Sequence, residues 1–406
     1  MSPDTKKYIS ENKSILFLFL LWMFRLLFLQ QGNEGGVVIN KFVVVQLFAE
    51  LGIFFALLAR RFNFFLILGT APIGWFTILY LLGMASIAWG ILPLMSCYFA
   101  FQNIIMLAAL FYLASRTKDF FQLERFYVFA NLFVLLVFLL RCVFFGGFNF
   151  HSVAYSTVAG FLLVYCVAEY DKSTRPPENV RMLGRGIFWG ILGLILTTSS
   201  GAMVSVAVAF LVLAMFAKHP GLKALAFLCI CAVLIGYFSG ASDWVFQVLF
   251  PGKSMWSIQT AHGRTVLWSM ILERAAERPW LGWGFASVER TLPLYTINAH
   301  NAVIGTLGSQ GYVGCGILIL AMLTMFFFIW GKVGGLGFRG LFAACVCGFV
   351  NSNTSNFIAT KAGLQSLAFQ MIIILASVYY LKSKEKPSSM ANVAGQLPQR
   401  ENRPSK

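Results

Sequence analysis

The sequence predicts an all-α integral membrane protein of about 12 transmembrane helices, with one long polar loop that contains short helices. Of its 406 residues, 59% are hydrophobic and only 11% are charged, whereas soluble domains carry about 25% charged residues. Apolar runs of about 18 residues or more recur along the whole chain, which is typical of membrane-spanning helices. Strands of soluble proteins rarely exceed about ten residues, so the length of these runs favours helices over buried strands.

The apolar runs form two groups of helices, one on each side of the loop. Residues 1–240 hold nine predicted spans, residues 241–300 form the loop, residues 301–382 hold three further spans, and residues 383–406 form a polar tail that we expect to be disordered. The predicted spans are residues 15–30, 37–59, 62–82, 97–115, 121–145, 151–169, 186–199, 202–217, 223–240, 301–330, 339–358 and 364–382. Residues 83–96 and the break at residues 197–201 are candidates for re-entrant segments.

The formal net charge of +16 is explained by membrane topology rather than by nucleic-acid binding. Cytoplasmic loops of membrane proteins carry an excess of Lys and Arg. An even number of spans puts both termini on one side. With the N-terminus inside, most of the 31 basic residues fall on the cytoplasmic side. The loop at residues 241–300 then lies on the outer side, and we expect membrane lipids but no nucleic acid among the partners.

The loop contains a predicted amphipathic helix. Residues 265–277 are helix-forming, and Pro279 ends the run. On a helical wheel two arginines share one side with three apolar residues, and two acids lie opposite. The first side comprises Arg264, Leu267, Ile271, Ala275 and Arg278, and the opposite side comprises Glu273 and Glu277. Arginines on an apolar face indicate an anionic partner. The plainer alternative is snorkelling at the membrane surface, which also applies to Arg274 and Arg290.

Two further stretches of the loop stand out. Residues 280–285, with the sequence WLGWGF, form a glycine-punctuated aromatic turn that suits a membrane interface. Asn298 can cap the next span, and His300 then lies in the first helical turn, where the positive helix end disfavours an imidazolium ion. A neutral His300 suits a general base, while a hydrogen-bonding role at the interface is the alternative reading.

Charges inside the predicted spans are a separate signal, because such charges are usually paired or functional. Arg25 and Glu50 can pair with each other across the first two helices. Arg141, near the outer end of the fifth span, has no nearby acid in the sequence, so an anionic ligand is favoured there.

The order of these motifs resembles the O-antigen ligase and polysaccharide polymerase superfamily of bacteria. The family pattern has an arginine with a downstream tryptophan, a glycine-rich aromatic turn, a His-Asn pair and a glycine-punctuated start of the next helix. Here these are Arg264 with Trp268, RPWLGWGF at residues 278–285, His300 with Asn301, and LGSQGYVG at residues 307–314. Residues 146–151 also look like that family's loop before its sixth span, and the hydropathy profile matches over most of the chain.

The resemblance implies a membrane glycosyltransferase that moves a glycan from undecaprenyl diphosphate to an acceptor. In a ligase the acceptor is lipid A–core, and in a polymerase it is a second carrier-linked repeat unit. The implied location is the bacterial inner membrane, crossed many times, with both termini in the cytoplasm and the active site facing the periplasm. By the resemblance, Arg264 contacts the diphosphate and His300 activates the acceptor hydroxyl. Our charge argument adds Arg141 and Arg290 as further candidates for the diphosphate.

The implied chemistry needs no cofactor. The diphosphate already activates the sugar, so the enzyme has to neutralise phosphate charge and remove one proton. The planar guanidinium fork of arginine binds two phosphate oxygens. We expect no metal, since we find no DxD motif and no acids in the loop helix beyond Glu273 and Glu277. One departure from the family is Ser200, which stands where the family commonly has an arginine at the start of its eighth span.

Three other interpretations remain open at this point. The polymerase reading competes with the ligase reading, which we favour by a small margin. A non-enzymatic transporter of the polysaccharide or its lipid carrier has a similar hydropathy, although transporters often show repeated halves and we find no repeat. A metal-dependent glycosyltransferase could use Glu34, which lies in a predicted outer loop.

Overall fold

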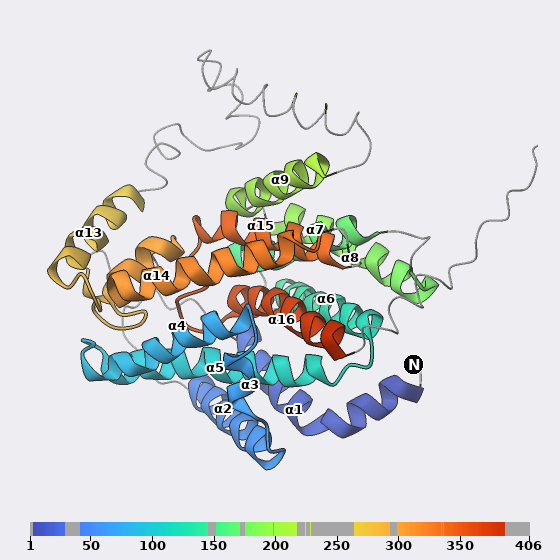
Figure 1. The fold of residues 1–406 in the computed structure, drawn as a ribbon, viewed down its shortest axis with the longest axis horizontal. Coiled ribbons are helices and arrows are strands. Elements are labelled where there is room, and N and C mark those ends of the chain that lie inside the picture. Colours follow the sequence, from blue (N-terminus) through green and yellow to red (C-terminus); the bar gives the residue numbers. More distant parts are fainter. Residues whose placement is uncertain are drawn as a thin grey trace, which may run out of the picture.

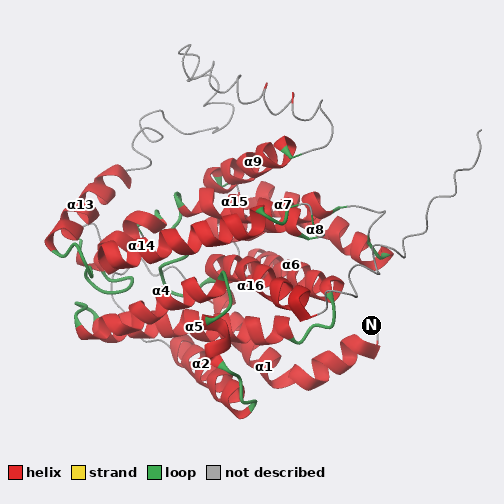
Figure 2. Cartoon of the chain, viewed as in Figure 1, coloured by secondary structure: helices red, strands yellow, loops and turns green. Residues whose placement is uncertain are grey.

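The computed structural model describes residues 3–28, 41–144, 152–170, 175–197, 199–216, 224, 228, 264–292, 299–333, 335 and 337–385. These residues form helices, turns and loops, and no strand occurs among them (Figure 2). In Figure 1 the long helices lie side by side along the long axis of the molecule, and α13 lies at one end, beside the start of α14. The all-α prediction is therefore confirmed.

The described helices follow one another with short connections. They are α1 (Pro3–Phe28), α2 (Lys41–Ala59), α3 (Phe64–Leu68), α4 (Ile73–Ala85), η1 (Ser86–Ala88), α5 (Pro93–Ser115), α6 (Phe120–Phe144), α7 (Ser152–Glu169), α8 (Pro177–Thr197), α9 (Ser200–Met215), α13 (Arg264–Glu277), η2 (Val288–Thr291), α14 (Ala302–Trp330), α15 (Phe338–Ser352) and α16 (Leu364–Glu385).

The bundle is built to cross a membrane. Five described helices are long and apolar enough to span it, namely those that include α5, α6, α8, α14 and α16, and five shorter apolar helices accompany them. Large apolar side chains on these helices are exposed to the surroundings, for example Phe188 at 61% and Phe327 at 64%. A helix surface of this kind is stable against lipid chains but not against water. The chain is therefore a multi-pass membrane protein, and the count of about twelve spans stays a prediction.

Two predicted spans differ from the helices that form. The structure divides residues 62–82 into α3 and α4, because Gly69 ends α3 and Pro72 stands before α4; proline lacks the N–H that a continuous helix needs. The predicted span at residues 339–358 ends early, at Ser352, because a run of Asn, Ser and Thr follows in which side chains bond to nearby backbone groups. Residues 353–363 instead form a loop, which we call the 353–363 loop.

The other predicted boundaries can be compared in part. The break at residues 197–201 is confirmed, since α8 ends at Thr197 and α9 begins at Ser200. The candidate re-entrant segment at 83–96 contains the end of α4, the short helix η1 and the start of α5. The predicted span at 223–240 and the first part of the loop lie outside the described residues, apart from two single positions. The same is true of the tail after Glu385.

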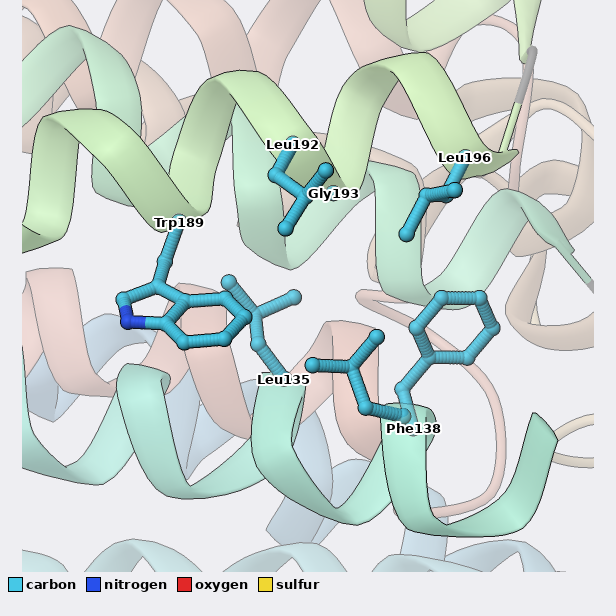
Figure 3. A pocket seen from close by; sticks show the side chains of 7 residues that line it. Leu135, Phe138, Trp189, Leu192, Gly193 and Leu196 are labelled. Carbon is cyan, nitrogen blue, oxygen red and sulfur yellow. The ribbon is translucent and has the colours of Figure 1, made fainter. Parts of the chain in front are cut away.

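A small apolar cavity between α6 and α8 tests whether the bundle itself holds a ligand. Leu135 and Phe138 of α6 face Trp189 and Leu196 of α8 across it (Figure 3). Its volume is about 10 Å³, which is room for about one water molecule. A glycan or a diphosphate does not fit there, so the candidate site has to be sought at the end of the bundle where α13 lies.

Candidate functional site

The helix α13 packs as its sequence pattern predicts. Leu267, Ile271 and Ala275 are buried, while Glu273 and Glu277 are exposed. The buried side chains join Val288, Leu292 and Ala299 in a small hydrophobic cluster that is separate from the core of the bundle. This cluster ties α13 to η2 and to the residues before α14. We call residues 264–292 and 299–301 the α13 lobe.

Two of the loop arginines have structural roles. Arg278 lies beyond the end of α13 and is exposed, so its predicted place on the buried face is wrong. Its guanidinium carbon lies 4.2 Å from the centre of the Trp283 ring, and that of Arg274 lies 5.5 Å from the same ring. Arg274 also pairs with Glu277 at 3.0 Å. Cation–π and ion-pair contacts of this kind account for both side chains without a ligand.

The aromatic turn joins the α13 lobe to a break in α14. The helix is interrupted at Gly311, which has a φ of 63°. The turn fills the break with backbone hydrogen bonds: Gly284 N donates to Ser309 O at 2.7 Å, and Tyr312 N donates to Pro279 O at 2.7 Å. Gly282 also has a positive φ, of 62°, so the expected tight turn is confirmed. The α13 lobe is thus fixed to α14 through the backbone.

His300 precedes α14 rather than lying in its first turn. The N-cap is Asn301, whose Oδ1 accepts hydrogen bonds from Val303 N and Ile304 N, each at 3.0 Å. The expected cap, Asn298, lies outside the described residues. An N-cap accepts from the first turn through its side chain, and Asn301 does so here, one residue after the histidine. His300 itself is half-buried and has a φ of 54°, a left-handed conformation that residues other than glycine seldom adopt.

The α13 lobe brings Arg264 close to the histidine segment. Trp268, one helical turn after Arg264, donates from its indole Nε1 to Ala299 O at 2.8 Å. Residues four apart on a helix lie on the same face, about 6 Å apart along its axis. Arg264 itself donates from a terminal nitrogen to Thr354 O at 3.0 Å. One face of α13 therefore holds both the backbone before His300 and the 353–363 loop.

The surroundings of Arg264 attract anions. Among the acidic side chains that the structure describes, none forms an ion pair with Arg264, and burial lowers the pKa of its guanidinium. The residue begins α13, so its charge adds to the positive end of the helix dipole. A second helix start lies close by, because a Cβ on Gly201 would lie only 2.6 Å from Thr354 Oγ1. Ser200, at the position of the family's usual arginine, is the first residue of that helix, α9.

The two other arginine candidates differ in what can be said of them. Arg290 is half-buried and lies with its guanidinium carbon 5.1 Å from the centre of the Phe99 ring, beside Met95 of α5. It is directed toward α5 rather than toward Thr354, so the structure does not join it to Arg264. The backbone puts Arg141 in the last turn of α6. The side chain of Arg141 and residues 145–151 lie outside the described part of the chain.

Sequence reasoning missed Glu289 and the 353–363 loop. Glu289 is only 3% exposed, and its Oε1 accepts a hydrogen bond from Ala299 N at 3.3 Å. A Cβ on Gly305 would lie 3.4 Å from that oxygen and 2.5 Å from Asn356 Nδ2, so the acid and the loop meet at the first turns of α14. Glu289 is flanked by buried Val288 and Leu292. Its place between apolar neighbours was the signal available in the sequence.

Intramembrane charge and metal ligands can be examined only in part. Glu50 accepts hydrogen bonds from Trp22, Gln46 and Gln102 at 2.6–2.8 Å. The Arg25 side chain expected to pair with Glu50, and the segment that holds Glu34, lie outside the described residues. In the ranges that the structure does describe, no group of three or more His, Cys, Asp or Glu side chains is arranged to hold a metal ion.

Comparison with known proteins agrees with the geometry. Residues 186–319 match the sequence model of a family described as O-antigen ligase. The match begins in α8 and ends in α14, and it includes Arg264, Arg290 and His300 but not Arg141 or the 353–363 loop. A search of curated proteins returns no match to this chain. Proteins of the matched family are bacterial membrane proteins that transfer glycans as ligases or polymerases. Residues 186–319 of this chain are thus an O-antigen ligase domain.

Proposed function

We propose that this protein is a metal-independent glycosyltransferase of the bacterial inner membrane. It moves a glycan from undecaprenyl diphosphate to an acceptor at the periplasmic face, and the favoured acceptor is lipid A–core. The observation that carries the proposal is the meeting of Arg264 and the His300 segment on one face of α13. A cation without an acidic partner lies there beside a candidate base.

The reaction needs two services from these residues. The acceptor hydroxyl oxygen attacks the anomeric carbon of the glycan, and the bond from that carbon to the diphosphate oxygen breaks. His300 takes the hydroxyl proton, so it acts as the general base. Arg264, supported by the positive end of α13, stabilises the negative charge that grows on the departing diphosphate. The products are the glycosylated acceptor and free undecaprenyl diphosphate.

Arg290 and Arg141 have secondary roles in the proposal. Burial lowers the pKa of Arg290, and the nearby Glu289 carboxyl opposes that effect. A half-buried guanidinium over an aromatic ring keeps donor groups for a phosphate. Arg141 stands in the last turn of α6, at the end of the bundle where Gln365, just after the 353–363 loop, bonds to Val153 O at the start of α7. We assign both as additional diphosphate contacts.

The test is transfer by purified protein in liposomes that contain a carrier-linked glycan and lipid A–core. We expect His300→Ala and Arg264→Ala each to lower the transfer rate by about a hundredfold or more, the range found when a general base or one charge-stabilising donor is removed. Arg274→Ala is the matched control, because Arg274 is already paired with Glu277. Wild-type rates in both active-site variants would overturn the assignment of these residues.

The same liposomes separate the alternative functions. Glycan attached to lipid A–core identifies a ligase, whereas longer carrier-linked chains, formed from a second carrier-linked repeat unit, identify a polymerase. Carrier that crosses the bilayer without any transfer identifies a transporter. Loss of transfer in a strong chelator would favour the metal-dependent reading, which would use Glu34.

A further inference from the structure

Glu289 is a buried acid in contact with the segment that holds His300. It belongs to η2, is 3% exposed, and accepts the N–H of Ala299 at 3.3 Å. Burial raises the pKa of its carboxyl, although hydrogen bonds from backbone N–H groups oppose that effect. A buried acid is unfavourable unless its hydrogen bonds compensate, so a specific role is expected for it.

Both peptide groups of Ala299 are held. Its N–H is bound by Glu289, and its carbonyl oxygen accepts from Trp268 Nε1 at 2.8 Å. That carbonyl belongs to the peptide bond that leads into His300. On the other side of the histidine, Asn301 is fixed as the N-cap of α14. The backbone of His300 is therefore clamped from both directions.

The clamp explains an unusual conformation. A φ of 54° at His300 costs a non-glycine residue of the order of 1–2 kcal/mol. Strained residues of this kind persist where the surroundings determine them, and they are common at functional sites. There is no spare room around the clamp, because a Cβ on Gly305 would lie 3.0 Å from Ala299 Cβ and 3.4 Å from Glu289 Oε1.

We infer that Glu289 is a positioning residue, which holds the backbone before His300 in the conformation that aims the imidazole at the acceptor. The inference rests on the proposed function of His300 as the base. The carboxyl acts through its acceptor oxygen, which is present in both of its protonation states. An amide oxygen at the same position can therefore replace it, whereas a methyl group cannot.

The test compares Glu289→Ala, Glu289→Gln and Glu289→Asp in the full-length protein in liposomes. We expect the Ala variant to lose at least tenfold in kcat while KM for the carrier-linked glycan changes less than threefold, because Arg264 is untouched. The Gln variant keeps kcat within about threefold of wild type. The Asp variant is one methylene too short to reach Ala299 N and falls between them, and it serves if the Ala variant does not fold. Glu273→Ala, an exposed acid on α13, is the matched control.

A second measurement does not depend on transfer. Diethyl pyrocarbonate modifies accessible neutral histidines, and peptide mass spectrometry reports the rate at His300 alone. We expect the Ala and Asp variants to change that rate severalfold and the Gln variant to leave it unchanged. The inference is overturned if the Ala and Asp variants keep wild-type modification rates, or if the Gln variant is as impaired as the Ala variant. If His300→Ala leaves transfer intact, the proposed function fails, but this measurement still tests the coupling of Glu289 to His300.

Discussion

Arg175 and Arg264 lie at opposite ends of the bundle and are treated in opposite ways. Arg175, with 2% of its side chain exposed, donates to Glu124 at 3.1 Å and contacts Glu169. Glu169 in turn accepts hydrogen bonds from Gly337 N at 3.0 Å and Gly340 N at 2.6 Å. This network links the connection between α7 and α8 to the start of α15. Its charges are satisfied within the protein, so Arg175 is a structural arginine.

Arg264 is held by a backbone carbonyl instead. Its described hydrogen bond is to Thr354 O, and no described carboxylate pairs with it. A half-buried guanidinium with only a neutral acceptor retains most of its attraction for an anion. The comparison teaches that pairing, rather than burial alone, separates an arginine that stabilises the fold from one that is available to a substrate.

The hydrophobic clusters around the two arginines differ in the same sense. The bundle has a large continuous core drawn from most of its helices, whereas the α13 lobe has five buried residues of its own. The lobe depends correspondingly more on hydrogen bonds and on the backbone contacts at the break in α14. Changes in the lobe should therefore alter transfer before they unfold the protein.

The largest predicted effect is that of Arg175→Ala on stability. The change leaves two buried carboxylates without their cation, and breaking a buried ion pair by removing one partner costs about 3–5 kcal/mol. Thermal unfolding in detergent measures this loss. Arg264→Ala should unfold close to the wild-type temperature while abolishing transfer. If the two variants lost similar stability, the distinction between a structural and a substrate-binding arginine would be wrong.

The next largest effect concerns the junction between the lobe and α14. A Cβ on residue 311 would lie 2.3 Å from the backbone of Trp280, and the φ of 63° is unfavourable for alanine. We expect Gly311→Ala to speed amide hydrogen exchange in residues 264–292 at least tenfold while the bundle stays protected. Gly316→Ala is the control in the same helix, because nothing lies within 4 Å of its added Cβ. Equal exchange in both variants would show that the junction does not hold the lobe.

The bundle was more predictable from the sequence than the site. Hydropathy and length predicted most of the described spans because lipid-facing helices have to be long and apolar. The face of α13 followed from the spacing of Leu267, Ile271 and Ala275. The contacts of Glu289 and Thr354 could not be predicted, because they join residues 10 and 90 positions away from their partners. The cap at Asn301 was misplaced because two asparagines stand three residues apart and either suits the role.

A smaller effect is expected in the pH dependence of stability. Burial raises the pKa of Glu289 above its ordinary value of 4.5, so the folded protein binds this proton more tightly than the unfolded chain does. The stability that this proton contributes is complete below about pH 4.5 and is lost as the pH rises through the folded-state pKa. We expect the difference between the wild-type and Glu289→Gln unfolding curves to change in that window alone. A difference that stays constant with pH would contradict the shift.

The smallest predicted effect, and the sharpest test of the anion site, is a rescue. Ser200 starts α9, and its neighbour Gly201 lies against Thr354, the residue that Arg264 holds. An arginine at position 200 would therefore bring a guanidinium to the same anion, as the family's usual residue does. We expect Ser200→Arg to change the transfer rate of the wild type by less than threefold but to restore about tenfold in the Arg264→Ala background. Ser200→Lys in that background should restore less, because an ammonium lacks the two-point fork that matches a diphosphate. If neither change raises the rate, the start of α9 lies outside the reach of the bound diphosphate, and Arg264 binds the anion without help from that helix.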